Sequence, residues 1–178
     1  MLPARGHVGT RTIVACLPQR DGDSLVHVSK LPMEPSPEFS AEEVMYYILE
    51  GLKHNDFPEI DAGLKRCFAF SNNMCRSAVG GDDSRAGGTT VEHFIKYASN
   101  PTFQSLVRCE KYEREDMNFL PSSPTRGALA TQIAHITTKN GDKRRFLWTL
   151  EQERRPPQQG CWLIRQCLYT KNAFLETI

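Results

Sequence analysis

The chain has 178 residues, enough for one domain with an appended segment, and its 22 basic and 21 acidic side chains leave a net charge of +1. No apolar run approaches the roughly 18 residues of a membrane-spanning helix, so no membrane span is predicted. Residues 1–20 hold three arginines and no acid, which leaves the rest of the chain at −2. That body lacks the basic excess of a duplex-binding domain, so no nucleic-acid partner is expected.

Residues 1–39 are predicted to lie outside the core, as a disordered or targeting extension. Five of the eleven prolines fall here, and LPMEPSPEF at 31–39 has the composition of an extended linker. The acid-free start is typical of an organelle transit peptide but contains no serine, so an ordinary disordered tail is the alternative. Because the segment has no periodic apolar face, its removal is expected to leave the melting temperature nearly unchanged.

Residues 40–178 are predicted to form the folded domain, beginning with a helix. Ser40 and Glu43 have the spacing of a capping box, and apolar residues then recur at helical spacing from Val44 to Leu52. A second, shorter helix is predicted over 58–70, with Ile60 on its apolar face. The polar, glycine-rich stretch 72–88 lacks a phosphate-loop motif and is expected to be a mobile surface loop.

A third helical piece follows this loop. Thr89 and Glu92 have the spacing of a second capping box, and the helix that they open should turn Phe94 inward. Asn100 is then placed to cap a short turn that has Pro101 at its first position.

The hydrophobic period changes from 3.6 to 2 after Val107. Strands are predicted over 107–115, 129–136, the segment around 146–150, and 162–168. Asn140-Gly141 suits a type I′ hairpin turn between the second and third of these. Three helical pieces followed by an antiparallel meander predict an α+β fold, with the helices on the concave face of one curved sheet.

Cysteine spacing argues against a metal site. None of the six cysteines forms C-x-x-C, and the histidines lack H-x₃₋₅-H spacing, so neither zinc nor another cofactor is predicted. The start of the chain also lacks the apolar stretch of a secretory signal. We therefore expect reduced thiols that pack as small apolar groups.

Several short motifs resemble those of the family described as domain of unknown function 4864 (DUF4864). Asn55-Asp56 lies near the end of the first helix, Asp61-Ala62-Gly63 follows, and FAFSN occupies 68–72. Further matches are Phe94, the turn 100–103 (NPTF), and the G-x-W-x-I pattern of residues 160–164. The resemblance covers roughly residues 40–170.

This resemblance implies the nuclear transport factor 2-like (NTF2-like) fold, in which a bent sheet wraps about three helices around a pocket. The glycine-rich insertion at 80–88 interrupts the family pattern before the third helix. Plant and algal relatives carry N-terminal extensions, so the resemblance implies a plastid (chloroplast) address, with mitochondrion or cytoplasm as alternatives. The superfamily includes enzymes and noncatalytic modules, so the fold does not select a function.

Four side chains are candidates for lining a pocket between the first helix and the sheet: Tyr47, His135, Trp148 and Gln166. His135 alternates with Leu129 and Ile133, so its imidazole could point inward and change charge near neutral pH. The alternative is a solvated histidine at a strand end. The other three could equally serve the core or the sheet, and no catalytic residue is assigned.

Two classes of function remain. The chain is either a noncatalytic module that holds a small apolar ligand or a protein partner, including a second copy through the sheet, or a small isomerase, dehydratase or hydrolase. The enzyme needs His135 within about 3 Å of a carboxylate or substrate proton inside a closed pocket. The module is favoured, because only Asp61 and Glu151 are acids near the strand interior, and Glu151 is expected to point outward.

Overall fold

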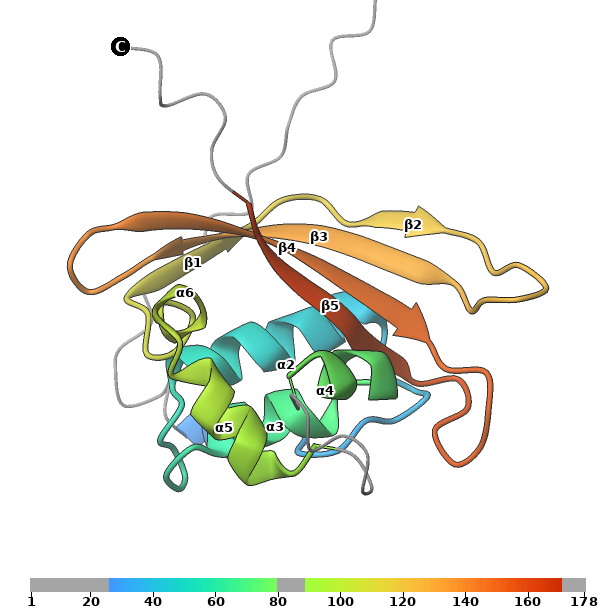
Figure 1. Ribbon diagram of the computed structural model, residues 1–178, viewed down its shortest axis with the longest axis horizontal. Coiled ribbons are helices and arrows are strands. Elements are labelled where there is room, and N and C mark those ends of the chain that lie inside the picture. Colours follow the sequence, from blue (N-terminus) through green and yellow to red (C-terminus); the bar gives the residue numbers. More distant parts are fainter. Residues whose placement is uncertain (1–25, 80–88, 171–178) are drawn as a thin grey trace, which may run out of the picture.

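The computed structural model describes residues 26–79 and 89–170, which form two layers (Figure 1). Five antiparallel strands make one open sheet, and the helices lie along one of its faces. Within the described residues the other face carries no helix. The α+β class and the one-sided helical layer are therefore confirmed.

The described helices that follow residue 40 are α2 (Ala41–Lys53), α3 (Ala62–Ala69), α4 (Asn73–Val79), α5 (Val91–Ala98) and α6 (Pro101–Gln104). The predicted capping box opens α2, because Ser40 Oγ accepts from the Glu43 amide at 3.2 Å and Glu43 Oε2 accepts from the Ser40 amide at 2.8 Å. Asn100 caps α6 as expected. None of the described helices is long and apolar enough to cross a bilayer.

Two helix boundaries differ from the prediction. The second helix begins at Ala62 rather than Pro58, and Ile60 is exposed rather than turned inward. The third is capped by Thr90, whose hydroxyl accepts from the His93 amide. Thr89 is instead buried and donates its hydroxyl to the Arg76 carbonyl at 2.6 Å, which ties α4 to the start of α5.

The expected surface loop over 72–88 is wrong in its first part, since Asn73–Val79 is helical. The Asn72 side chain accepts from the Cys75 amide at 2.9 Å, and the Arg76 guanidinium donates to the carbonyls of Phe68 and Ala69. These contacts hold α4 although none of its residues is buried. Residues 80–88, the rest of the predicted loop, lie outside the described residues.

The strands are β1 (Lys111–Arg114), β2 (Asn118–Leu120), β3 (Leu129–Thr137), β4 (Lys143–Gln152) and β5 (Trp162–Thr170). Their order is β1-β3-β4-β5, and β2 pairs with the same edge of β3 as β1, nearer the start of β3. The first predicted strand is thus shorter than expected, and β2 was not predicted.

The turn between β3 and β4 is not the predicted type I′ turn. Gly141 has φ +85°, but Asn140 is not among the described residues with positive φ. The Gly141 amide donates to the Thr138 carbonyl and the Thr138 amide donates to the Asp142 carbonyl, both at 2.9 Å. This is the longer hairpin loop in which a glycine in the left-handed region follows an ordinary turn.

A bulge changes the faces of β5. Thr149 pairs with Gln166, whereas the next residue, Leu150, pairs with Ile164, so Arg165 is an extra residue in β5. Side chains before and after Arg165 therefore exchange faces. Ile164 and Cys167 lie on the helical side, paired with Leu150 and Trp148. The strand predicted over 162–168 therefore does not alternate regularly along its whole length.

One hydrophobic core joins the two layers. Ile48 and Leu52 of α2 belong to the same buried cluster as Phe146 and Trp148 of β4, and Trp162 packs against it. This confirms that the helices seal one side of the sheet. All the cysteines in the described residues are free.

The N-terminal segment takes part in this packing from residue 26 onward. Val28 is fully buried and Leu31 is 5% exposed. The Pro32 carbonyl accepts from Arg66 Nε at 2.9 Å, and Arg66 is itself buried. The segment therefore supplies the only hydrogen-bond acceptor of that guanidinium within the described residues. Because Val28 and Leu31 are buried, removing 1–39 is expected to lower the melting temperature rather than leave it nearly unchanged. Residues 1–25, with the predicted transit peptide, lie outside the described residues.

Leu31→Ala is expected to lower the free energy of unfolding by about 2 kcal/mol, because a nearly buried leucine loses its packing and leaves a cavity. Urea denaturation followed by circular dichroism measures this change. Met33→Ala is the matched control two residues away, where the side chain is 40% exposed and a change below about 0.5 kcal/mol is expected. Equal losses in the two variants would contradict specific packing of Leu31.

Candidate functional site

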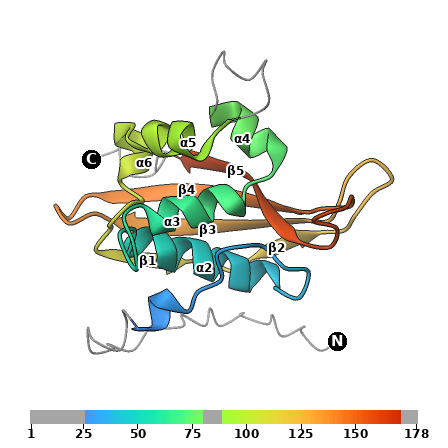
Figure 2. The same ribbon diagram turned by 90° about the horizontal axis from the view of Figure 1, so that it is seen from below.

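A hollow with a volume of about 390 Å³ lies among α2, α3, α4, α5, α6 and strands β4 and β5. In Figure 2, α4 and α5 lie on the side of the helical layer where β5 forms the sheet edge. The volume falls within the usual range of small-molecule pockets. Residues that border it include Leu52, Leu64, Cys67, Met74, Cys75, Ala78, Phe94, Tyr97, Ala98, Phe103, Leu106, Trp148, Ile164, Gln166, Cys167 and Leu168.

The cavity opens where its walls reach the surface. Met74 of α4 and Tyr97 of α5 both border it, and they are 58% and 40% exposed. Large apolar side chains with that exposure at the border of a cavity favour an entrance at which an apolar molecule can leave water.

The walls carry almost no charge. Among the described residues no histidine, aspartate or glutamate borders the cavity, and the one charged side chain there, Arg165, donates to Glu151 Oε2 at 2.7 Å. Burial raises the pKa of the Cys67, Cys75 and Cys167 thiols, so all three stay protonated at neutral pH. The cavity therefore offers packing surface rather than acid–base or nucleophilic groups.

Trp148 and Gln166 border the cavity, but they contribute differently. Trp148 is buried on the helical face of β4, and its Nε1 has no hydrogen-bond partner within residues 26–79 and 89–170, so the ring acts as an apolar wall. Gln166 pairs with Thr149, and the bulge turns its side chain toward the face away from the helices. A binding role for either stays a prediction.

Tyr47 and His135 lie away from the cavity. The half-buried Tyr47 ring packs edge-on against Phe39, 5.3 Å between centroids, and does not border the cavity. His135 is on the uncovered face of β3, because the buried side chains of this strand are Ala130, Gln132, Ala134 and Ile136. The inward position considered for His135 is therefore wrong, and the structure agrees with the alternative, a solvated histidine.

His135 does have a carboxylate partner. Its Nε2 lies 2.7 Å from Glu115 Oε1, and the two side chains are 44% and 47% exposed. The distance suits an acid–base pair. His135 also borders a second hollow of about 250 Å³, but Glu115 does not, and both side chains stay nearly half exposed. The pair therefore lacks the exclusion of water that the enzyme hypothesis required.

Sequence reasoning missed the sulfur-bearing side chains of the cavity: Cys67, Met74, Cys75 and Cys167. Cys67 lies in α3, within the range of the predicted second helix, which was a usable indication. Met74 and Cys75 belong to α4, where a loop was expected. Cys167 reaches the helical side only because of the bulge at Arg165.

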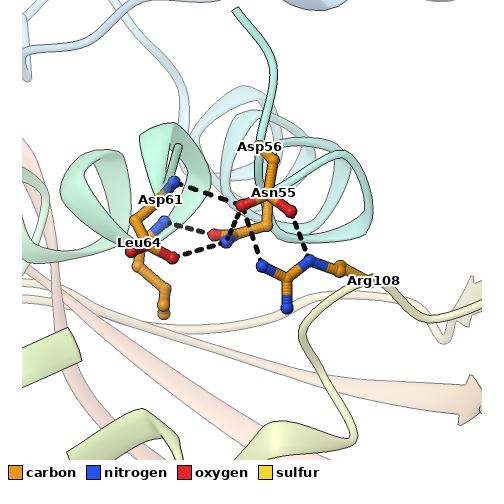
Figure 3. A network of polar contacts seen from close by, with 5 residues as sticks. All are labelled: Asn55, Asp56, Asp61, Leu64 and Arg108. Carbon is orange, nitrogen blue, oxygen red and sulfur yellow. Dashed lines mark hydrogen bonds and ion pairs between the residues drawn. The ribbon is translucent and has the colours of Figure 1, made fainter. Parts of the chain in front are cut away.

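A separate polar network joins the ends of α2 and α3 (Figure 3). The fully buried Asn55 accepts from the Leu64 amide through Oδ1 at 3.0 Å, and its Nδ2 donates to Asp56 at 3.0 Å and to Asp61 at 2.9 Å. Arg108, which follows α6, donates to both oxygens of Asp56. These hydrogen bonds lower the pKa of Asp56 and raise that of Arg108.

The network also holds two strained residues. Asp61 and Arg108 have φ values of +60° and +57°, a left-handed conformation that costs an ordinary side chain about 1 kcal/mol. Asp61 occupies the position before α3 but makes no cap bond, and its carboxylate accepts from Asn55 instead. The Asn-Asp and Asp-Ala-Gly residues of the motifs thus meet in a structural network rather than in the cavity.

Within the described part of the chain, no group of three or more metal-ligating side chains comes together. Comparison with protein-family models, curated proteins and solved structures gives no match to this chain. The resemblance to family 4864 therefore stays a prediction.

Proposed function

We propose that this chain is a noncatalytic binding module whose cavity takes up a small, uncharged apolar molecule, within an NTF2-like cone of the kind expected for family 4864. The observation that carries the proposal is the open cavity of about 390 Å³, whose walls are apolar and contain no described histidine or carboxylate. Burying apolar ligand surface against such walls supplies the binding free energy.

The enzyme alternative is supported by one observation, the contact of 2.7 Å between His135 and Glu115. That pair is on the opposite side of the sheet from the cavity, so a molecule in the cavity cannot reach it. The module therefore accounts for the cavity without requiring the pair. A His135→Ala variant is expected to bind the same ligands with unchanged affinity.

The test uses N-phenyl-1-naphthylamine, an uncharged probe whose fluorescence rises when it leaves water. The full-length protein is expected to bind it saturably at one site. Ala78→Phe, which adds a ring to an exposed position that borders the cavity, should weaken binding by about tenfold or more. Ser77→Phe adds the same ring to an exposed neighbour in α4 that does not border the cavity, and should bind as the parent does.

The two variants keep the outcome interpretable, because both substitutions are on the surface of α4 and neither removes a buried contact. Absence of saturable binding to the parent protein would overturn the proposal. Equal affinity of Ala78→Phe and Ser77→Phe would also overturn it, since the probe would then be bound elsewhere.

A further inference from the structure

We infer that the cavity selects uncharged aromatic molecules over saturated ones with the same carbon connectivity; this inference rests on the proposed function and specifies its ligand class. The walls combine two kinds of polarisable group. Four sulfur atoms come from Cys67, Met74, Cys75 and Cys167, and four aromatic rings come from Phe94, Tyr97, Phe103 and Trp148.

The two kinds of group come from different elements of the fold. The sulfur atoms belong to α3, α4 and β5, whereas the rings belong to α5, α6 and β4. A ligand that fills the cavity therefore meets both. Thioether and thiol sulfur make favourable contacts with the edges of aromatic rings, and aromatic rings favour edge-to-face or offset contact with one another. A saturated ring system of equal size gains the burial but neither of these contacts.

The charge state of the walls excludes charged ligands. The thiols are protonated, and Arg165 is neutralised by Glu151, so the described wall residues provide no unpaired cation for a carboxylate ligand and no anion for an amine. An ionised ligand would lose its hydration without a compensating partner. The preferred ligand is therefore a neutral molecule with fused or linked aromatic rings.

Calorimetric titration with 2-naphthol and decahydro-2-naphthol isolates this preference, because the two share a carbon skeleton and a hydroxyl group and differ in aromaticity. We expect 2-naphthol to bind about tenfold more tightly. The anion 2-naphthoate should bind more weakly than 2-naphthol. Ala78→Phe should weaken both naphthols and so confirm that they occupy the cavity.

Met74→Leu tests how much a wall sulfur atom contributes to the preference for the aromatic ligand. Because Met74 is exposed, this substitution is expected to leave the fold intact. It should reduce the ratio of the two affinities about threefold, whereas Met33→Leu, an exposed methionine in the N-terminal segment, should leave the ratio unchanged. If both naphthols bind the cavity with equal affinity, or if the decahydro compound binds more tightly, the inference is overturned and the proposed function stands. If neither binds and N-phenyl-1-naphthylamine also fails, both are overturned.

Discussion

Gly63→Ala is expected to lower the free energy of unfolding by about 3 kcal/mol or more. A Cβ at this position would lie 2.2 Å from the Gly51 carbonyl oxygen and 2.7 Å from its carbon, both backbone atoms of α2. Helix α3 can make room only by moving away from α2. That movement would also stretch the 2.9 Å hydrogen bond from the Gly63 amide to the Asn55 carbonyl.

Urea denaturation monitored by circular dichroism measures this loss, with Gly141→Ala as the matched control. Gly141 has open space around it but φ +85°, so alanine there should cost only about 1 kcal/mol. A loss at Gly63 no larger than the loss at Gly141 would show that the two helices do not approach as closely as described.

Asn55→Ala is expected to destabilise the protein by about 3 kcal/mol. The substitution leaves the Leu64 amide buried without an acceptor, and it removes the donor that lies between the carboxylates of Asp56 and Asp61. An unsatisfied buried donor costs about 1–3 kcal/mol, and hydrogen bonds to charged groups contribute about 1.5–3 kcal/mol each. Overlap between these contributions keeps the total below their sum.

The control for Asn55 is Asn118→Ala, since Asn118 is exposed on β2 and should cost less than about 0.5 kcal/mol. Asn55→Asp is informative as well. It keeps an oxygen for the Leu64 amide but places a third carboxylate beside two others, and it should be at least as destabilising as alanine near neutral pH. If the aspartate variant were as stable as the parent, the described bonding of the Asn55 amide would be wrong.

The sequence predicted the elements whose determinants are local. The capping box at Ser40 and the apolar stripe that follows it are contacts within two turns of one helix, so they identify α2 without tertiary information. The alternation of side chains with a period of two residues likewise identified β3 and β4. In β4 the larger side chains of one alternation, such as Phe146 and Trp148, are the buried ones, so its inner face was predictable.

In β3 the same reasoning failed for a physical reason. Each alternation mixes apolar and polar side chains, so alternation alone does not identify the inner face. The buried set contains Ala130 and Ala134, whereas the larger Leu129 and Ile133 take the other face together with His135. The larger apolar side chains therefore do not mark the inner face of this strand.

The cavity was the least predictable part. Its walls depend on α4, which is short and has no buried residue. This helix is held by hydrogen bonds between backbone groups and the side chains of Asn72, Arg76 and Thr89. Such contacts leave no hydrophobic period in the sequence. Trp148 was identified because its strand alternates regularly, whereas the sulfur groups were missed because their positions depend on how α4 and β5 are placed.

The additional residue at Arg165 lets a single strand serve two purposes. Before it, Ile164 closes the core and exchanges backbone hydrogen bonds with Phe70 and Asn72; after it, Cys167 faces the hollow. A strand of unbroken alternation that kept Ile164 inside would turn Cys167 to solvent and put the Gln166 amide among the rings. The extra residue reverses which side chains of β5 face the helices from that point on. The cavity wall therefore contains a thiol rather than an amide because of this one inserted residue.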